Sequence, residues 1–334
     1  MKKLVLSMFA VAALASCVQN ETINPGSSID FGAPFVGNAT KAADPSYGED
    51  PAQPLTAFKV YGTVQGTGAS VVNIFNGADV TGSIGNNDWN CNVKQYWIEG
   101  ATYNFAAVVD AGVTPGDNNM PKTLSPQTNN DGFYKDMLYA FNGPITAAAE
   151  NDSVNFVFEH LLAKAQFVVT SNTVDGYYYN VEKIKIQNIH TDAVYTIGGT
   201  IVSSKDNGTW SGTLSTDVED WYSLGDIKNI TAANTLNKTE GDKFMTNATQ
   251  VLLIPTTTDF KVSFVVNLYN DNGAADDVLL RTIDCTDVNA KTVTTDLVKG
   301  YAYNFKLDLT TGTEIKFTVT SQPTWTSADS NLSL

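Results

Sequence analysis

The stretch YAYNFKLDL, residues 301–309, alternates between large apolar and mostly polar side chains. The apolar set is Tyr301, Tyr303, Phe305, Leu307 and Leu309, and the other set is Ala302, Asn304, Lys306 and Asp308. Successive side chains of a β-strand point to opposite faces of the sheet, so a period of two predicts a strand with one buried face. We therefore predict that this stretch is a strand whose apolar face lines a hydrophobic core.

Two further runs repeat the alternation, SVNFVFEH at residues 153–160 and EIKFTVT at residues 314–320. Their apolar positions are Val154, Phe156 and Phe158 in the first run and Ile315, Phe317 and Val319 in the second. The run KVSFVVNL, residues 261–268, is more continuously apolar, which is expected of a strand that is buried on both faces. All three runs are therefore predicted to be strands.

Turn-forming residues separate such runs at short intervals. They are Asn86-Asn87-Asp88, Pro115-Gly116-Asp117, Asp206-Asn207-Gly208 and Asp271-Asn272-Gly273. Helical periodicity is weak, and only residues 135–141 and 219–229 are compatible with short helices. Many strands with few helices predict an all-β fold made of β-sandwiches.

An internal repeat bears on the number of domains. The segments EGATYNFAAVVD, residues 99–110, and KGYAYNFKLDLT, residues 299–310, share a charged residue, a glycine, two further residues and Tyr-Asn-Phe. Each is expected to be a turn glycine followed by a core strand. With 334 residues and a hydrophobic fraction of 43%, the chain is long and apolar enough for two such domains. We predict an N-terminal sandwich at residues 54–160 and a C-terminal sandwich at residues 161–334.

The N-terminus has the three parts of a secretory signal peptide. Lys2 and Lys3 precede an apolar run of about a dozen residues, which is shorter than the ~20 that a membrane-spanning helix needs. Small residues then lead to Cys17, and this arrangement resembles the lipobox of bacterial lipoproteins. We expect residues 1–16 to be the signal peptide and Cys17 to carry lipid, the alternative being an ordinary signal followed by a chance cysteine.

Residues 17–53 are polar and rich in Gly, Pro, Ser and Asn, apart from Ile29-Asp30-Phe31 and Phe35-Val36. This composition predicts a tether and leader that contain one short strand.

The sequence offers little for catalysis or for binding cofactors, metals or nucleic acid. Its net charge of −15 would repel a phosphate backbone. Of the two histidines, His160 continues an apolar strand face and is expected to be structural, and His190 is expected to precede a turn at Thr191-Asp192. Cys91 and Cys285 lack metal-ligand spacing and are expected to be free, although a disulfide between them is the alternative. We expect neither an enzyme nor a cofactor.

Two other candidate binding features are weak. The run at residues 271–277 contains part of a calcium-loop pattern but lacks its spacing and its terminal Glu, so a hairpin turn is expected. Trp221, Tyr222 and Trp325 are the aromatic residues that could form an exposed sugar-binding platform.

Several segments, taken in order, resemble the fimbrillin family of Bacteroidales outer-membrane lipoproteins, the subunits of type V pili. They are the lipobox at Cys17, IDFGAPFVGNATKA at 29–42, VNFVFEHLLAKAQFVV at 154–169, VLLIP at 251–255, KGYAYNFKLDL at 299–309 and EIKFTVTSQPTW at 314–325. The resemblance implies two transthyretin-like β-sandwich domains and a pilus subunit that reaches the cell surface as a lipoprotein. Its partners would be copies of itself or related pilin subunits, and the outer membrane through the lipid on Cys17 before processing. The adhesion ligand is not indicated.

The resemblance also implies that a protease removes the leader and that a strand from another subunit fills the groove left behind. The displaced strand would contain Ile29, Phe31, Phe35 and Val36, and the cut would fall between Lys41 and Ala42. The family is commonly processed by an Arg-specific protease, whereas the sole arginine of this chain is Arg281. Either a protease that accepts lysine acts at Lys41, or the leader stays and the subunit remains anchored.

The alternating residues Ile315, Phe317 and Val319 would suit a donor strand, and they would equally suit an ordinary last strand of the chain's own sandwich. The alternative function is a non-polymerising outer-membrane lipoprotein that binds a glycan or a host surface molecule.

Overall fold

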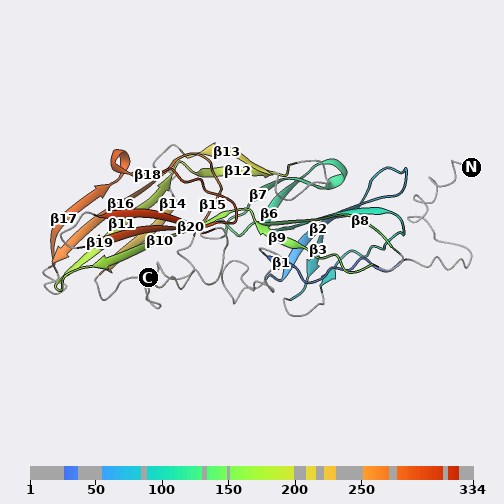
Figure 1. Ribbon diagram of the computed structural model, residues 1–334, viewed down its shortest axis with the longest axis horizontal. Helices are drawn as coiled ribbons and strands as arrows, with labels where there is room; N and C mark the ends of the chain where they lie inside the picture. The colour runs from blue at the N-terminus through green and yellow to red at the C-terminus, as the bar shows by residue number, and fades with distance from the viewer. Residues whose placement is uncertain are drawn as a thin grey trace, which may run out of the picture.

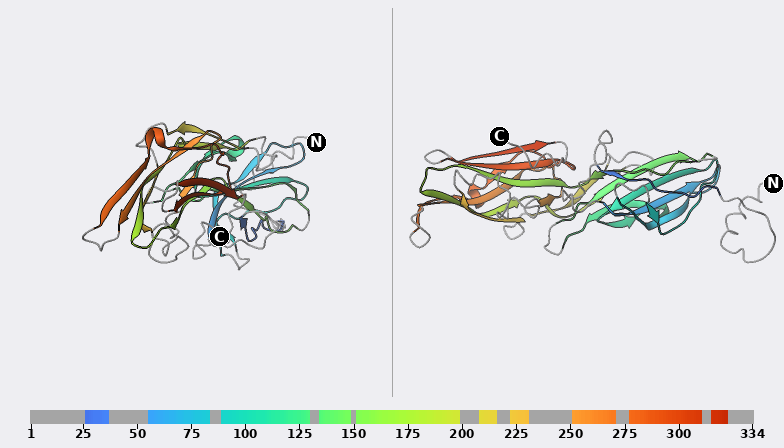
Figure 2. Two further views of the ribbon diagram at one scale, coloured as in Figure 1. Left: turned by 60° about the vertical axis from the view of Figure 1, so that its left-hand side comes forward. Right: turned by 90° about the horizontal axis from the view of Figure 1, so that it is seen from below.

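The protein is described by a computed structural model that covers residues 26–36, 55–83, 89–129, 134–148, 151–198, 208–215, 222–230, 251–270, 277–310 and 315–322. These residues form strands and short 3-10 turns without an α-helix, so the predicted all-β fold is confirmed. The N-terminal and C-terminal halves lie one after the other along an elongated molecule (Figure 1, Figure 2). None of the described residues belongs to a helix of the length and apolarity that crossing a membrane requires.

The N-terminal half is built on a seven-stranded sheet in the order β1-β9-β8-β5-β2-β3-β4. The strands are β1 (Phe35–Val36), β2 (Ala57–Gln65), β3 (Val72–Thr81), β4 (Asn90–Cys91), β5 (Thr102–Val109), β8 (Leu138–Thr146) and β9 (Val157–His160). Apart from the parallel pair β1–β9, neighbouring strands are antiparallel. The core of this half is rich in buried phenylalanine and tryptophan side chains. The predicted buried face of Val154, Phe156 and Phe158 is confirmed.

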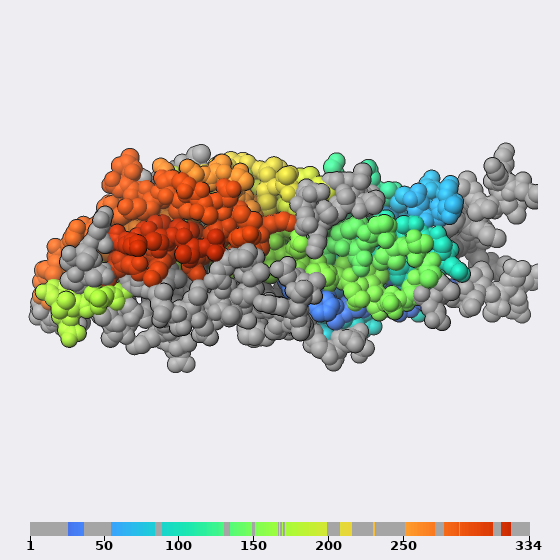
Figure 3. All heavy atoms as spheres, viewed as in Figure 1, coloured from blue at the N-terminus to red at the C-terminus, as the bar shows by residue number. Residues whose placement is uncertain are grey.

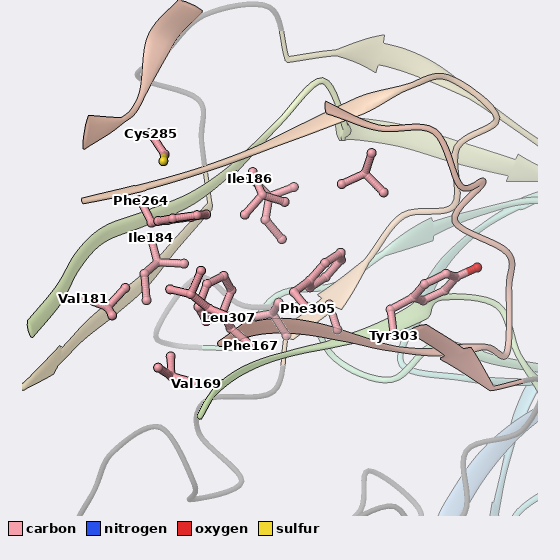
Figure 4. Packing of buried hydrophobic residues seen from close by; sticks show 14 of the residues in the cluster. Phe167, Val169, Val181, Ile184, Ile186, Phe264, Cys285, Tyr303, Phe305 and Leu307 are labelled. Atoms are coloured by element: carbon pink, nitrogen blue, oxygen red, sulfur yellow. The ribbon is translucent and has the colours of Figure 1, made fainter. Parts of the chain in front are cut away.

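The C-terminal half is a sandwich of two sheets with the orders β15-β10-β19-β20 and β14-β11-β16-β17. The first contains β10 (Ala163–Asn172), β15 (Val251–Leu253), β19 (Ala302–Thr310) and β20 (Lys316–Gln322). The second contains β11 (Tyr177–Gln187), β14 (Tyr222–Ile230), β16 (Phe260–Asn270) and β17 (Val278–Cys285), with β18 (Lys291–Val293) paired to β16. Side chains of β10 and β19 point toward those of β11 and β16 across the core (Figure 4).

The strand that opened the sequence analysis is β19, and its predicted inward face is confirmed. Tyr303, Phe305, Leu307 and Leu309 are all buried, and Tyr301 packs against the same core. Strand β16 is buried along most of its length, as its continuous apolar run predicted. Strands β16 and β17 are antiparallel and pair from Asn270 with Val278 onward, and residues 271–276 of the expected turn lie outside the described residues.

A fourth sheet, β13-β12-β7-β6, takes strands from both halves. It contains β6 (Ala111–Pro115), β7 (Pro121–Pro126), β12 (His190–Thr196) and β13 (Thr209–Leu214). Strands β7 and β12 pair across the two halves through Tyr195 with Leu124 and Thr196 with Thr123. Two 3-10 turns, η2 (Asp117–Asn119) and η6 (Asp287–Asn289), complete the described elements. The division at residue 160 stays a prediction, because a shared sheet connects the parts on either side of it.

Two expectations about local structure are wrong. Residues 135–141 and the described part of the second segment, residues 222–229, are not helical, because Leu138 and Tyr222 begin strands β8 and β14. Strand β8 is paired on both edges, by β5 and β9, and its short apolar run cannot be told from a buried helix by periodicity alone. Thr191 and Asp192 do not form the expected turn after His190, because all three belong to β12, which follows a bend at Asn188 and Ile189.

The internal repeat corresponds to a structural repeat. Gly100 and Gly300 both have a positive φ, +76° and +72°, in the left-handed region that favours glycine. The Tyr103 hydroxyl accepts a hydrogen bond from the Ile98 amide at 2.7 Å and donates one to the Tyr96 carbonyl at 3.2 Å. The Tyr303 hydroxyl makes the same two bonds, with the amide of Val298 at 2.8 Å and the carbonyl of Asp296 at 2.7 Å. Each tyrosine thus fixes the turn that precedes a central strand.

Replacing either tyrosine by phenylalanine should therefore destabilise the protein. Tyr103→Phe and Tyr303→Phe each remove two part-buried hydrogen bonds, and at about 0.5–1.5 kcal/mol for each bond the loss is about 1–3 kcal/mol. Chemical denaturation would measure the change. Tyr96→Phe is the control, since this ring is exposed and should change stability by at most about 0.5 kcal/mol. Equal values for all three variants would contradict the role given to the two turns.

Candidate assembly site: the leader strand and its groove

The leader segment, residues 26–36, lies between two other segments of the N-terminal half and bonds to both. On one side the Ile29 amide donates to the Gln95 carbonyl at 2.9 Å, and the Trp97 amide donates to the Ser27 carbonyl at 3.0 Å. On the other side the Val154 amide donates to the Asp30 carbonyl at 2.8 Å. The amides of Gly32 and Phe35 also donate to that side, to the carbonyls of Val154 at 3.1 Å and Phe156 at 2.9 Å.

The pairing has a different direction on each side. Bridges Ser28–Tyr96 and Phe31–Trp89 are antiparallel, whereas Phe31–Val154 and the β1–β9 pair are parallel. Trp89 precedes β4 and Val154 precedes β9, which belong to opposite ends of the seven-stranded order. The leader therefore bridges the two ends of that sheet. Its atoms reach the surface beside those of β9 (Figure 3).

Phe31 is the centre of the aromatic core of this half, with 2% of its surface exposed. Its ring centroid lies 5.6–6.3 Å from those of four other phenylalanines, Phe58, Phe75, Phe105 and Phe156. Ile29 and Val36 are also buried, whereas Phe35 is 37% exposed. The four residues predicted for the displaced strand thus lie in one segment, and three of them enter the core.

The leader fits closely but not completely. A Cβ atom at Gly32 would come within 2.0 Å of the Asn155 Oδ1 atom, so any larger residue there would require the Asn155 side chain to move. Beside the leader, the indole N–H groups of Trp89 and Trp97 are buried and have no hydrogen-bond partner within the described part of the chain. A buried N–H group without a partner costs about 1–3 kcal/mol, so this groove is not fully satisfied by its occupant.

Strand β20 is the last described strand and lies at one end of its sheet order, next to β19. It pairs from Lys316 with Asp308 to Gln322 with Ala302. Ile315, Phe317 and Val319 are half-buried against the core of the C-terminal half. The Phe317 ring lies 5.7 Å from that of Phe264 and 6.3 Å from that of Phe167, between ring centroids. In this state the candidate donor strand is folded into its own sandwich.

The junction of the two halves contains a buried ionisable pair. The His160 Nδ1 atom lies 2.9–3.0 Å from the Asp136 carboxylate, and the two side chains are 8% and 3% exposed. Nearby, Lys299 contacts Glu159 at 3.2 Å, and the Trp210 indole donates to the Leu161 carbonyl at 3.2 Å. The expectation that His160 faces the interior is confirmed by its burial, and its structural role stays a prediction.

Removing Asp136 should measure what this pair contributes. Asp136→Ala takes a hydrogen bond from a buried imidazole and should cost about 1–3 kcal/mol of unfolding free energy. Asp79→Ala is the matched control, because the Lys59–Asp79 pair is short, 2.7 Å, but more than half exposed on each side. An exposed pair contributes about 0–1 kcal/mol. Comparable losses in the two variants, measured by urea denaturation, would refute a special role for the buried pair.

Other candidate residues do not join this site. Cys17, Lys41, Ala42, Trp221 and Trp325 lie outside the described residues, as does the side chain of Tyr222. Cys91 and Cys285 are free cysteines, and burial raises the pKa of both thiols, which leaves them protonated and poorly nucleophilic. Among the described residues, no three His, Cys, Asp or Glu side chains come together in a way that could hold a metal ion.

Sequence reasoning missed the central position of Phe31 and the double-sided pairing of the leader. A signal was present, because IDFGA at 29–33 and IKFTV at 315–319 share the pattern Ile-x-Phe-x-small. The repeated pattern connects the leader with the candidate donor strand.

Comparison with known proteins gives a consistent result. A search of curated proteins finds no match. The structure is similar to that of a fimbrial protein from Bacteroides vulgatus, with a TM-score of 0.59 and 15% identity over 87% of this chain and 98% of the other. A fimbrial assembly protein from Parabacteroides distasonis also matches, with a TM-score of 0.43 and 13% identity over 89% and 99% of the two chains. A family model described as fimbrillin-like matches residues 40–323. Since that match spans most of the chain, this protein belongs to the fimbrillin-like family.

Proposed function

We propose that the protein is a structural subunit of a cell-surface pilus, delivered as a lipoprotein and polymerised by donor-strand exchange. The observation that carries this proposal is the leader strand, which is hydrogen-bonded on both sides and inserts Phe31 into the aromatic core. The family match and the likeness to a fimbrial protein support the same function. Lipid on Cys17 would hold the precursor to the outer membrane until the leader is removed.

Cleavage between Lys41 and Ala42 would free the leader to leave. Its departure would expose amide and carbonyl groups along Gln95, Trp97, Val154 and Phe156, together with the apolar pocket of Phe31. Unpaired backbone groups beside an apolar pocket are a template for an incoming strand, which satisfies both. The unpaired indole groups of Trp89 and Trp97 support an occupant that can be exchanged.

Strand β20 is the donor that we propose. If Ile315 takes the place of Ile29, then Phe317 takes that of Phe31 and Val319 that of Ala33. The direction of the chain also fits. Strand β20 begins at the end of the C-terminal half that is farthest from the junction, where Lys316 pairs with Asp308.

When released, β20 would extend from that end of the molecule, with residue 315 nearest its own subunit and residue 322 at the distal end. In the next subunit the groove begins at the outer end of the N-terminal half, where Ser27 pairs with Trp97, and runs to Val36 near the junction. In the groove, the donor chain would therefore run in the same direction as the leader that it replaces. Because the groove of one copy accepts the strand of another, the contact is heterologous and propagates as a filament.

The experiment uses a precursor with a site for a sequence-specific protease inserted between Lys41 and Ala42. We expect fibres in electron micrographs only after cleavage, and none from uncleaved protein at the same concentration. In the native cell, Lys41→Ala should leave the subunit anchored and unassembled. Cleaved protein that stays monomeric, with both halves folded by circular dichroism, would rule out polymerisation by this route.

A further inference from the structure

The exposed large hydrophobic side chains gather mainly at the two ends of the molecule. One group, which we name the N pole, contains Val72, Tyr96 and Ile98. The other, the C pole, contains Val174, Val278, Leu279 and Leu280. Three consecutive half-exposed apolar residues on a strand that ends its sheet order are unusual, because such strands are normally protected by charge or by short length.

The topology puts these groups at opposite ends. The junction is marked by the pairing of Leu138 with His160, and strand β8 ends eight residues later at Thr146, beside Thr102. Ile98 and Tyr96 bond to Tyr103 at that outer end. In the C-terminal half, β19 starts at the junction, and Val278 pairs with Asn270, at the other end of the half. The N-terminal and C-terminal halves lie in line between the two poles (Figure 1, Figure 2).

The junction inside the molecule provides a precedent for a contact between poles. The turn at Gly300 corresponds to the turn at Gly100, since both precede the same tyrosine motif. Each turn glycine donates to a carbonyl of its own half, Gly300 to Leu162 at 2.9 Å and Gly100 to Ala147 at 2.8 Å. In addition, Lys299 beside Gly300 contacts Glu159 of the N-terminal half at 3.2 Å and lies over the ring of Tyr195. Lys299 and Gly300 are partly buried, whereas Glu99 and Gly100 at the N pole are exposed.

The short connection between β19 and the donor strand limits the distance between the C pole of one copy and the N pole of the next. Residues 311–314 join β19 to Ile315, and four residues span at most about 14 Å. If Ile315 occupies the Ile29 position of the next copy, the N pole of that copy must lie close to the C pole that sends the strand. This step rests on the proposed function.

Charged residues flank the apolar side chains of both poles. At the N pole the exposed Lys94 lies 5.6 Å from the centroid of the Tyr96 ring. At the C pole Asp175 is exposed, and the carboxylate of Asp277 accepts a hydrogen bond from Tyr178 at 2.9 Å. Each pole also carries the opposite sign, at the exposed Glu99 of the N pole and the exposed Arg281 of the C pole, so a head-to-tail contact can bring charges of opposite sign together.

We propose that the C pole of one subunit packs directly against the N pole of the next copy, forming a second contact beside the inserted strand. Leu279 and Leu280 lie against Tyr96 and Ile98 of the neighbour, and Lys94 of the neighbour faces Asp175. This contact orders successive subunits in line, as the junction orders the two halves of one subunit.

The test uses cross-linking of cysteines in the cleavable full-length precursor that also carries Cys17→Ser, Cys91→Ser and Cys285→Ala. The pair Ile98→Cys with Leu279→Cys should give covalent ladders with a short bis-maleimide after leader cleavage. The control pair combines Ile98→Cys with Val194→Cys, an exposed valine of β12 far from both poles. We expect at least a tenfold excess of cross-linked dimers and higher species for the pole pair.

Fibres that form normally while both pairs cross-link equally would overturn the pole contact and leave donor-strand exchange intact. A complete failure to form fibres, with the protein folded, would overturn both proposals. As a second measurement, Leu279→Asp with Leu280→Asp should shorten fibres several-fold while the leader peptide is still released. Unchanged fibre length in that variant would also count against the pole contact.

Discussion

Phe31→Ala should lower the unfolding free energy of the precursor by about 3–5 kcal/mol, because it empties the centre of a packed cluster of phenylalanines. The lost side chain is 2% exposed, and the surrounding rings come from several strands and cannot easily close the cavity. Urea denaturation followed by fluorescence would measure the change. The variant should also release its leader peptide faster after cleavage, because the leader is held less tightly.

Phe35→Ala is the matched control within the same leader. Phe35 is 37% exposed and lies on β1, so its loss should cost about 1 kcal/mol or less. A precursor in which both substitutions have the same small effect would mean that the leader contributes little to the core. The groove would then have no apolar pocket for a donor to fill.

Phe317→Ala should reduce fibre extension by about a hundredfold or more, because a donor without this ring leaves the Phe31 pocket empty. Phe317 also packs on Phe167 and Phe264 in its own half, so a modest loss of stability accompanies the substitution. Thermal unfolding would show that the variant is folded at the assay temperature. Its groove is unchanged, so a cleaved subunit can still accept a strand.

The Phe317→Ala subunit thus has a defective donor strand and an intact groove, so it can accept a strand but donates one poorly. Cleaved Phe317→Ala subunits, mixed with wild type, should cap growing fibres and shorten them in proportion to their molar fraction. Thr318→Ala is the control, since it alters the neighbouring position of β20 and leaves the Ile-x-Phe pattern intact. Variants that copolymerise without shortening fibres would contradict the assignment of β20 as donor.

Much of the fold could be read from the period of the hydrophobic pattern. The alternation around Phe305 and Phe156 predicted strands with the correct inward faces, because one face of each is packed on a core. Strand β8 was not predicted from the hydrophobic pattern, because it lies between strands β9 and β5 and shows a short apolar run instead of an alternation. The same Tyr-Asn-Phe motif that suggested two similar domains forms two equivalent turns, at Gly100 and Gly300.

The assembly site was predictable only in outline. Ile29, Phe31 and Val36 could be assigned to one strand from their apolarity, but which strands they join depends on long-range pairing with Trp89 and Val154. Local sequence does not encode such pairing. The sheet shared by β7 and β12 was missed for the same reason, because Leu124 and Tyr195 are far apart in sequence.

The central claim is that a strand of another copy replaces the leader, and the fate of the leader peptide tests it most directly. The cleavable precursor would be cut, allowed to assemble and separated into fibres and supernatant, and the leader peptide would be quantified in each by mass spectrometry. The account predicts fibres free of leader, with one leader peptide in the supernatant for each subunit incorporated. Fibres that retain the leader in equal amount to the subunit would contradict it.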